Sequence, residues 1–155
     1  METDEVHDKA RFHMQYQTFN GRFKFVCMLL LILSEYLFLV WHTCINSPIA
    51  LTTLYPYAAV FLTVFIGVTY YGYNVCFPNF EILSVIVFDF VSYCGLLTGM
   101  ISVCGITLRG CARYAGFYYF LPEILGLLTA VMLLVNSVFW FCKHYKTFKE
   151  YYMDV

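Results

Sequence analysis

The sequence predicts an all-α, polytopic membrane protein, a bundle of four transmembrane helices with both termini in the cytoplasm. Hydrophobic residues make up 61% of the 155 residues and charged residues only 12%, whereas soluble globular chains have roughly 45–50% and about 25%. Four apolar stretches are each long enough to cross a bilayer, and most basic residues lie near the two ends of the chain. Such scarce charge excludes a disordered chain, and a net charge of −1 leaves no basic face for nucleic acid.

The apolar stretches set the predicted domain boundaries. Each is longer than the about 20 residues that a helix needs to cross ~30 Å of hydrocarbon. None shows the alternation of apolar and polar residues that is typical of a barrel strand. They run from Phe25 to Ile45, Ile49 to Tyr73, Ile82 to Ile106 and Phe117 to Cys142. The chain therefore divides into a cytoplasmic tail (1–24), a four-helix transmembrane domain (25–142) and a second cytoplasmic tail (143–155).

The basic residues predict the orientation of the bundle. Seven of the nine flank the transmembrane domain on the side of the termini, and an excess of Lys and Arg marks the cytoplasmic side. They are Lys9, Arg11, Arg22, Lys24, Lys143, Lys146 and Lys149, with Arg109 and Arg113 as the exceptions. Aromatic residues near the span ends, such as Tyr55 and Trp140, are expected in the two interfacial belts.

The first tail carries an aromatic face. Phe12, Tyr16, Phe19 and Phe23 recur at helical spacing. Two interpretations stay open, an interfacial amphipathic helix that leads into the first span and a frayed juxtamembrane extension. Asn20-Gly21 is expected to weaken the continuity of this helix. Because the tail carries several acids and precedes a long apolar run, it does not fit a cleavable signal peptide.

Three of the predicted spans carry faces of small residues, which allow helices to approach closely in lipid. The positions are Ala59, Thr63 and Gly67, then Gly95 and Gly99, then Gly126 and Ala130. We expect these faces to pack the bundle, with homo-oligomerisation through the same faces as the alternative.

Three acids, Glu35, Asp89 and Glu123, lie within the predicted spans. A charge in hydrocarbon costs at least a few kcal/mol, so these residues are expected to face the bundle interior. No Lys or Arg lies within any span, so we expect a clasp of hydrogen bonds rather than a buried ion pair. Candidate partners are Tyr93, Thr63 and Asn136. A cation or proton site, a catalytic acid pair and contact with a partner membrane protein are the alternatives.

The cysteines fall into two groups by predicted position. Cys44, Cys104 and Cys111 lie at the outer ends, where Cys111 is a candidate for a disulfide with Cys44 or Cys104. Cys27, Cys76 and Cys142 lie near the cytoplasmic face and are candidates for S-palmitoylation. The sequence has no Cys-x-x-Cys, no phosphate-binding loop and no nucleophile elbow, and its histidines are dispersed. We therefore predict no enzyme, no cofactor and no metal site.

The C-terminal residues resemble short recognition signals. Tyr152-Met-Asp-Val155 fits a Tyr-x-x-Φ sorting sequence, and Met153 and Val155 occupy the positions that a PDZ groove reads. These signals predict cytoplasmic sorting adaptors or scaffold proteins as partners.

Three features carry a family resemblance. The first span is rich in leucine around Glu35, and the third has Asp89 in its inner half followed by small residues (Val87-Phe-Asp-Phe-Val-Ser-Tyr-Cys-Gly95). The third connection carries Cys111. With four spans and little outside the bilayer, the chain resembles the MARVEL-domain proteins of the MAL, chemokine-like-factor and physin type. The likeness is one of architecture over nearly the whole chain, from which the very short first connection and Arg109 and Arg113 depart.

The resemblance implies a non-enzymatic integral membrane protein. Its expected role is to organise membrane microdomains, vesicle trafficking, or membrane apposition and fusion, in the plasma membrane or in endomembrane vesicles. It would associate laterally with membrane lipids and with other membrane proteins or itself. The alternative function is a proton- or cation-conducting subunit that uses Glu35 and Asp89.

Overall fold

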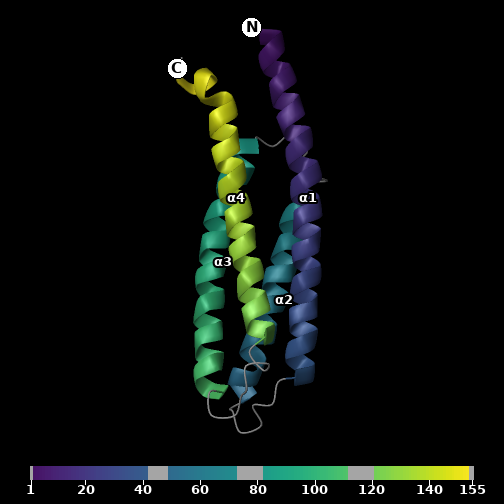
Figure 1. Ribbon diagram of the computed structural model, residues 1–155, viewed down its shortest axis with the longest axis vertical. Helices are drawn as coiled ribbons and strands as arrows, with labels where there is room; N and C mark the ends of the chain where they lie inside the picture. Colours follow the sequence, from purple (N-terminus) through teal and green to yellow (C-terminus); the bar gives the residue numbers. More distant parts are fainter. Residues whose placement is uncertain (1, 42–48, 73–81, 112–120, 154–155) are drawn as a thin grey trace.

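A computed structural model describes residues 2–41, 49–72, 82–111 and 121–153. They form four helices, α1 (Glu2–Trp41), α2 (Ile49–Tyr71), α3 (Ile82–Cys111) and α4 (Leu121–Met153) (Figure 1). Each helix contains a stretch long and apolar enough to cross a membrane. The predicted all-α class with four long apolar helices is confirmed, and the arrangement is consistent with a four-span membrane bundle.

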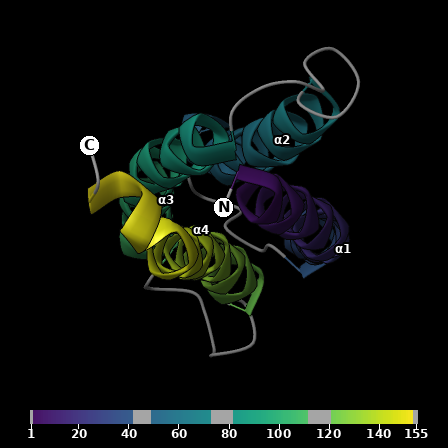
Figure 2. The same cartoon turned by 90° about the horizontal axis from the view of Figure 1, so that it is seen from above.

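The helices form a ring of four. Helix α1 packs on α2, α2 on α3, α3 on α4, and α4 closes the ring against α1. Seen along the bundle, α1 and α3 lie at opposite corners (Figure 2). Successive helices run in opposite directions, so α1 begins and α4 ends at the same end of the bundle (Figure 1). We call this the termini end and the opposite end the far end.

Helix α1 is much longer than the predicted first span. It begins at Glu2 rather than Phe25 and continues through Asn20-Gly21 without a break. A Cβ at Gly21 would overlap the Tyr70 hydroxyl of α2, so glycine permits a close approach of the two helices. The 40 residues of α1 correspond to about 60 Å of helix, which is twice the hydrocarbon thickness of about 30 Å.

Several threonine side chains bond to backbone carbonyl groups of their own helices. Thr63 Oγ1 donates to the Ala59 carbonyl oxygen at 2.8 Å, and Thr129 Oγ1 donates to that of Leu125 at 2.8 Å. Such back-bonding satisfies a hydroxyl donor without a partner from a neighbouring helix. Polar residues in apolar helices are tolerated for this reason.

The bundle core is apolar and so is much of the outer surface. Core residues recur at helical spacing, as Cys27, Leu31 and Phe38 do on α1. Large apolar side chains also point outward, among them Leu39 at 67% exposed and Val68 at 66% exposed. An exposed apolar surface of this kind is typical of proteins that are covered by lipid or by other proteins.

The aromatic face of residues 12–23 contributes to the interior of the bundle. Phe12 and Tyr16 are buried with Val85, Ile86 and Trp140 in a second apolar cluster at the termini end. The Trp140 ring meets the Tyr16 ring edge-on, with centroids 5.2 Å apart. Trp140 is therefore an interior residue rather than a member of an interfacial belt, and the belt assignment is wrong for the fully buried Tyr55 as well.

Candidate functional site

A buried ion pair joins α1 to α3 across the bundle. Lys24 Nζ lies 2.8 Å from Asp89 Oδ2, and the two side chains are only 2% and 3% exposed. The Tyr16 hydroxyl donates a second hydrogen bond to the same carboxylate oxygen, at 3.3 Å. The Lys24 ammonium lies 5.6 Å from the centroid of the Tyr93 ring, which is within cation–π range. Because α1 and α3 occupy opposite corners (Figure 2), these side chains lie in the interior of the bundle.

This pair corrects the expectation that the buried acids have no basic partner. The sequence predicts Lys24 in the tail because the first apolar run begins after it. In the structure Lys24 lies inside α1, on a buried stripe with Asn20, Cys27 and Leu31. The spacing of these residues, four and then three and four, places them on one helical face. That spacing is the sequence signal that would have identified Lys24 as an interior residue.

The pair is sealed from water. Residues around Asp89, including Ile86, Ser137 and Trp140, leave a space too tight for a water molecule. Within the described part of the chain, the second carboxylate oxygen of Asp89 has no hydrogen-bond partner. A single charge in such surroundings would carry an uncompensated desolvation cost, and the opposite charge offsets much of it. The arrangement is suited to holding α1 and α3 in register.

A neutral polar contact lies beside the pair. Asn136 Nδ2 of α4 donates to Asn20 Oδ1 of α1 at 2.9 Å. Asn136 was a candidate partner for a buried acid, and the structure pairs it with Asn20 instead. Polar contacts thus join α1 to both α3 and α4 in this part of the bundle.

A second polar contact, which we call the far-end node, joins three helices. It comprises Ser34 of α1, Tyr55 of α2 and the carbonyl group of Pro122 in α4. The Ser34 and Tyr55 hydroxyls lie 2.6 Å and 2.7 Å from the Pro122 oxygen and 2.5 Å from each other. A Cβ at Gly126 would overlap the Tyr55 hydroxyl. Glycine at this position is therefore required for Tyr55 to reach Pro122.

The other two predicted acids lie toward the far end. Glu123 is buried beside the far-end node, and its backbone oxygen lies 3.8 Å from the Cys104 thiol, which donates to it. Glu35 is half-buried and lies about 16 Å along α1 from Lys24. The structure therefore does not bring Glu35 and Asp89 together into one site.

The predicted packing faces divide into buried and exposed positions. Ala59, Gly126 and Ala130 are buried, and Thr63 and Gly67 are half-buried. Gly95 and Gly99 are exposed, and a Cβ at either would meet open space. The prediction that these two glycines pack the bundle is therefore wrong, because the sequence reveals a small-residue face but not the direction in which the helix presents it.

The described cysteines are free thiols. Cys104 is buried and forms no disulfide, and full burial of Cys27 contradicts its predicted palmitoylation, which requires an accessible thiol. Cys142 is exposed on α4. Cys44 and Cys76 lie outside the described residues, as does the side chain of Cys111.

A thiol-labelling experiment tests this division. In the folded protein in mild detergent, a small maleimide is expected to modify Cys142 much faster than Cys27 or Cys104, because the Cys142 thiol is exposed and the other two are buried. Peptide mapping by mass spectrometry measures each site, and denaturation should equalise the three. Fast modification of Cys27 in the folded protein would contradict its burial.

The C-terminal signals lie at the end of α4. The helix extends through Met153 and so includes Tyr152, whereas Val155 lies outside the described residues. Within the described helices, no group of three or more His, Cys, Asp or Glu side chains could hold a metal ion.

No protein-family model, curated protein or solved structure matches this chain. The candidate site is therefore defined by two groups of polar contacts in the structure. The first is the Lys24–Asp89 pair with Tyr16 near the termini end, and the second is the Ser34–Tyr55–Pro122 node at the far end.

Proposed function

We propose that this chain is a MARVEL-like four-span membrane protein that organises membrane microdomains, vesicle trafficking or membrane apposition by lateral association. Its partners would be membrane lipids, other membrane proteins or further copies of itself, and sorting adaptors or scaffold proteins at the cytoplasmic termini. Its location would be the plasma membrane or endomembrane vesicles. The role is not enzymatic.

This proposal is based on the contrast between the interior of the bundle, where polar side chains bond to one another, and its exposed surface, which is apolar. Inside the bundle, Lys24 is paired with Asp89, Asn20 with Asn136, and Ser34 with Tyr55. Outside, the surface is rich in large apolar side chains. The surfaces that remain for binding therefore face the lipid, where contacts are lateral.

The exposed glycines of α3 support association with another membrane protein. Gly95 and Gly99 form a G-x-x-x-G pattern, and open space lies where each Cβ would be. In lipid, such a pattern lets a second helix approach the backbone closely. The described part of the bundle leaves this face uncovered.

Two observations support cytoplasmic termini. The helix α1 begins and α4 ends at one end of the bundle (Figure 1), and seven of the nine Lys and Arg residues lie in the flanks of the predicted domain on that side. Such an excess of positive charge is typical of the cytoplasmic side.

Energy transfer between donor- and acceptor-labelled copies in liposomes tests self-association through α3. We expect Gly95→Leu/Gly99→Leu to lower the transfer, because two isobutyl groups would hold an approaching helix away. The matched control is Gly105→Leu, on the same helix, also exposed and facing open space, but on a different side of α3. An equal loss of energy transfer in the control, or no loss in the double variant, would contradict self-association through the face of Gly95 and Gly99. If the partner is another protein, proximity labelling in native cells should show the same pattern of loss.

Ion flux tests the alternative, a proton- or cation-conducting subunit. A conducting path would have to connect Glu35 and Asp89, which lie at different levels of the bundle. We expect liposomes that contain the purified protein to leak protons no faster than protein-free liposomes. Flux that disappears in Asp89→Asn would favour the alternative.

A further inference from the structure

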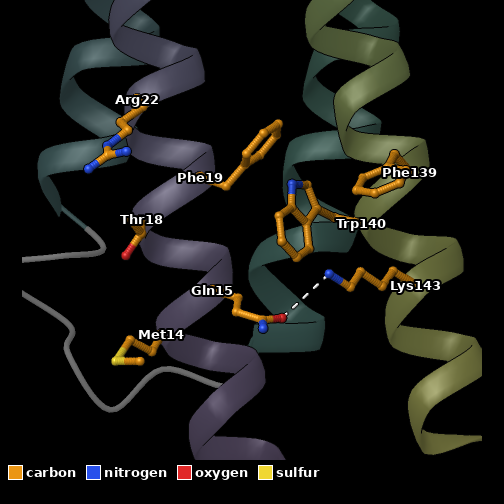
Figure 3. Close-up of a pocket in the computed structure, with 8 residues that line it drawn as sticks. All are labelled: Met14, Gln15, Thr18, Phe19, Arg22, Phe139, Trp140 and Lys143. Carbon is orange, nitrogen blue, oxygen red and sulfur yellow. Dashed lines mark hydrogen bonds between the residues drawn. The ribbon is translucent and has the colours of Figure 1, made fainter.

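An open groove runs between α1 and α4 on the outside of the bundle. Near the termini end it has a volume of about 560 Å³, within the range of ligand-binding pockets. Its eight lining residues are Met14, Gln15, Thr18, Phe19, Arg22, Phe139, Trp140 and Lys143. Figure 3 shows Phe19 and Trp140 pointing into the space between the helices, with Gln15 and Lys143 meeting across it. Two of these lining residues are cationic and none is acidic, so this part of the groove favours an anion.

The groove continues toward the far end as an apolar channel. This part has a volume of about 400 Å³, and its polar side chain is that of Asn136. The other lining residues are Phe19, Phe23, Val131, Met132, Val135 and Phe139. Phe19 and Phe139 line both parts, so the cationic and apolar parts are continuous.

The size and direction of the groove match one lipid leaflet. From Lys143 to Val131 the helix rises about 18 Å, and half of the hydrocarbon core is about 15 Å. Lys143 lies toward the termini end and the apolar residues lie toward the bundle centre, as the head group and acyl chains of a lipid do, whereas Arg22 adjoins the apolar part through its neighbour Phe23. Arg22 lies deeper than Lys143, and its guanidinium extends toward Thr18, which is nearer the termini end (Figure 3). This is the direction in which a basic side chain snorkels to reach head groups.

We propose that this groove binds one anionic glycerophospholipid of the leaflet at the termini end. Arg22 and Lys143 bind the phosphate and head group, while Gln15 and Thr18 offer hydrogen bonds. One acyl chain lies along Phe23 and Val135. The proposal rests on the proposed lateral association with lipids and deepens it, because it names the lipid class and the residues that select it.

Native mass spectrometry of the delipidated full-length protein tests the proposal, with dioleoyl phosphatidylserine and dioleoyl phosphatidylcholine as probes. We expect wild-type protein to retain the serine lipid preferentially. In Arg22→Gln/Lys143→Gln, binding of that lipid should weaken about 25-fold, because each basic residue near an anionic head group accounts for about fivefold. The matched control is Arg11→Gln/Lys146→Gln, which removes the same charge from exposed positions of the same helices outside the groove. The control should bind as the wild type does.

The apolar part is tested separately. Val135→Trp, at an exposed position, should fill the channel and weaken the binding of both lipids, and glycerophosphoserine without acyl chains should not compete. Three results would overturn the proposal. They are an equal loss of serine-lipid binding in the charge control, unchanged binding of that lipid in Arg22→Gln/Lys143→Gln, and competition by glycerophosphoserine. Absence of lipid selectivity in the wild-type protein, with energy transfer between its copies observed, would refute this inference alone. Absence of energy transfer between wild-type copies, with lipid selectivity observed, would refute self-association and leave the groove assignment standing.

Discussion

Replacing Asp89 by alanine is expected to lower the free energy of unfolding by about 3–5 kcal/mol, because the Lys24 ammonium would stay buried without its counter-charge. Tyr16 would also lose its acceptor. Lys24→Met should be destabilising for the reciprocal reason. Circular dichroism during thermal or denaturant unfolding in detergent micelles measures each change.

The double variant Lys24→Met/Asp89→Leu separates charge from packing. Replacing both members of a buried pair by apolar residues of similar size is often neutral or stabilising, so the double variant should be closer to wild type than either single variant. The control is the exposed pair between Lys9 and Glu5 on the same helix, whose removal should cost only about 0.3–0.5 kcal/mol. A double variant as unstable as the single ones would mean that the interaction between these two side chains is not what stabilises the bundle.

The second large effect is expected at Gly126. In Gly126→Ala the new methyl group would overlap the Tyr55 hydroxyl and displace it from Ser34 and Pro122. Overpacking together with lost buried hydrogen bonds should lower the free energy of unfolding by about 2–4 kcal/mol. The same unfolding measurement in micelles applies.

A second-site substitution makes this prediction specific. Tyr55→Phe removes the atom that overlaps, so Gly126→Ala should cost less in the Tyr55→Phe background than in wild type. Gly95→Ala is the control, because its Cβ would meet open space and alanine is the better helix former by up to about 1 kcal/mol. Additive effects of Tyr55→Phe and Gly126→Ala would show that the hydroxyl is not the source of the cost.

The four helices could be predicted because each contains a long continuous apolar run, which in lipid has few alternatives to a helix. The start of α1 could not be predicted in the same way. Residues 2–24 contain no such run, and their helical state depends on contacts such as those of Phe12 and Tyr16 with Trp140. Those contacts require the relative positions of α1 and α4, which the spacing within one segment does not give.

The candidate site was predicted only in part. Asp89 was identified as an interior acid because a charge in a span is costly, but its partner was missed because Lys24 precedes the apolar run. The far-end node was missed for a different reason. Ser34 and Tyr55 are common residue types, and only the fold brings them to Pro122. The direction in which Gly95 and Gly99 face likewise depends on the rotation of α3 within the ring.

The length of α1 has a consequence for the acids in its first turns. Gln15 lies beside Lys143, and from there α1 rises about 20 Å to Glu2. With Lys143 at the level of the head groups, as proposed for the groove, the distance to Glu2 exceeds two Debye lengths of about 8 Å at physiological ionic strength. In that placement Glu2 lies beyond two Debye lengths from an anionic leaflet, and Asp4 and Glu5, at about 16 and 15 Å along the helix, lie about two Debye lengths from it. In the proposed placement, the helical extension of α1 would hold these acidic residues away from a negatively charged membrane surface.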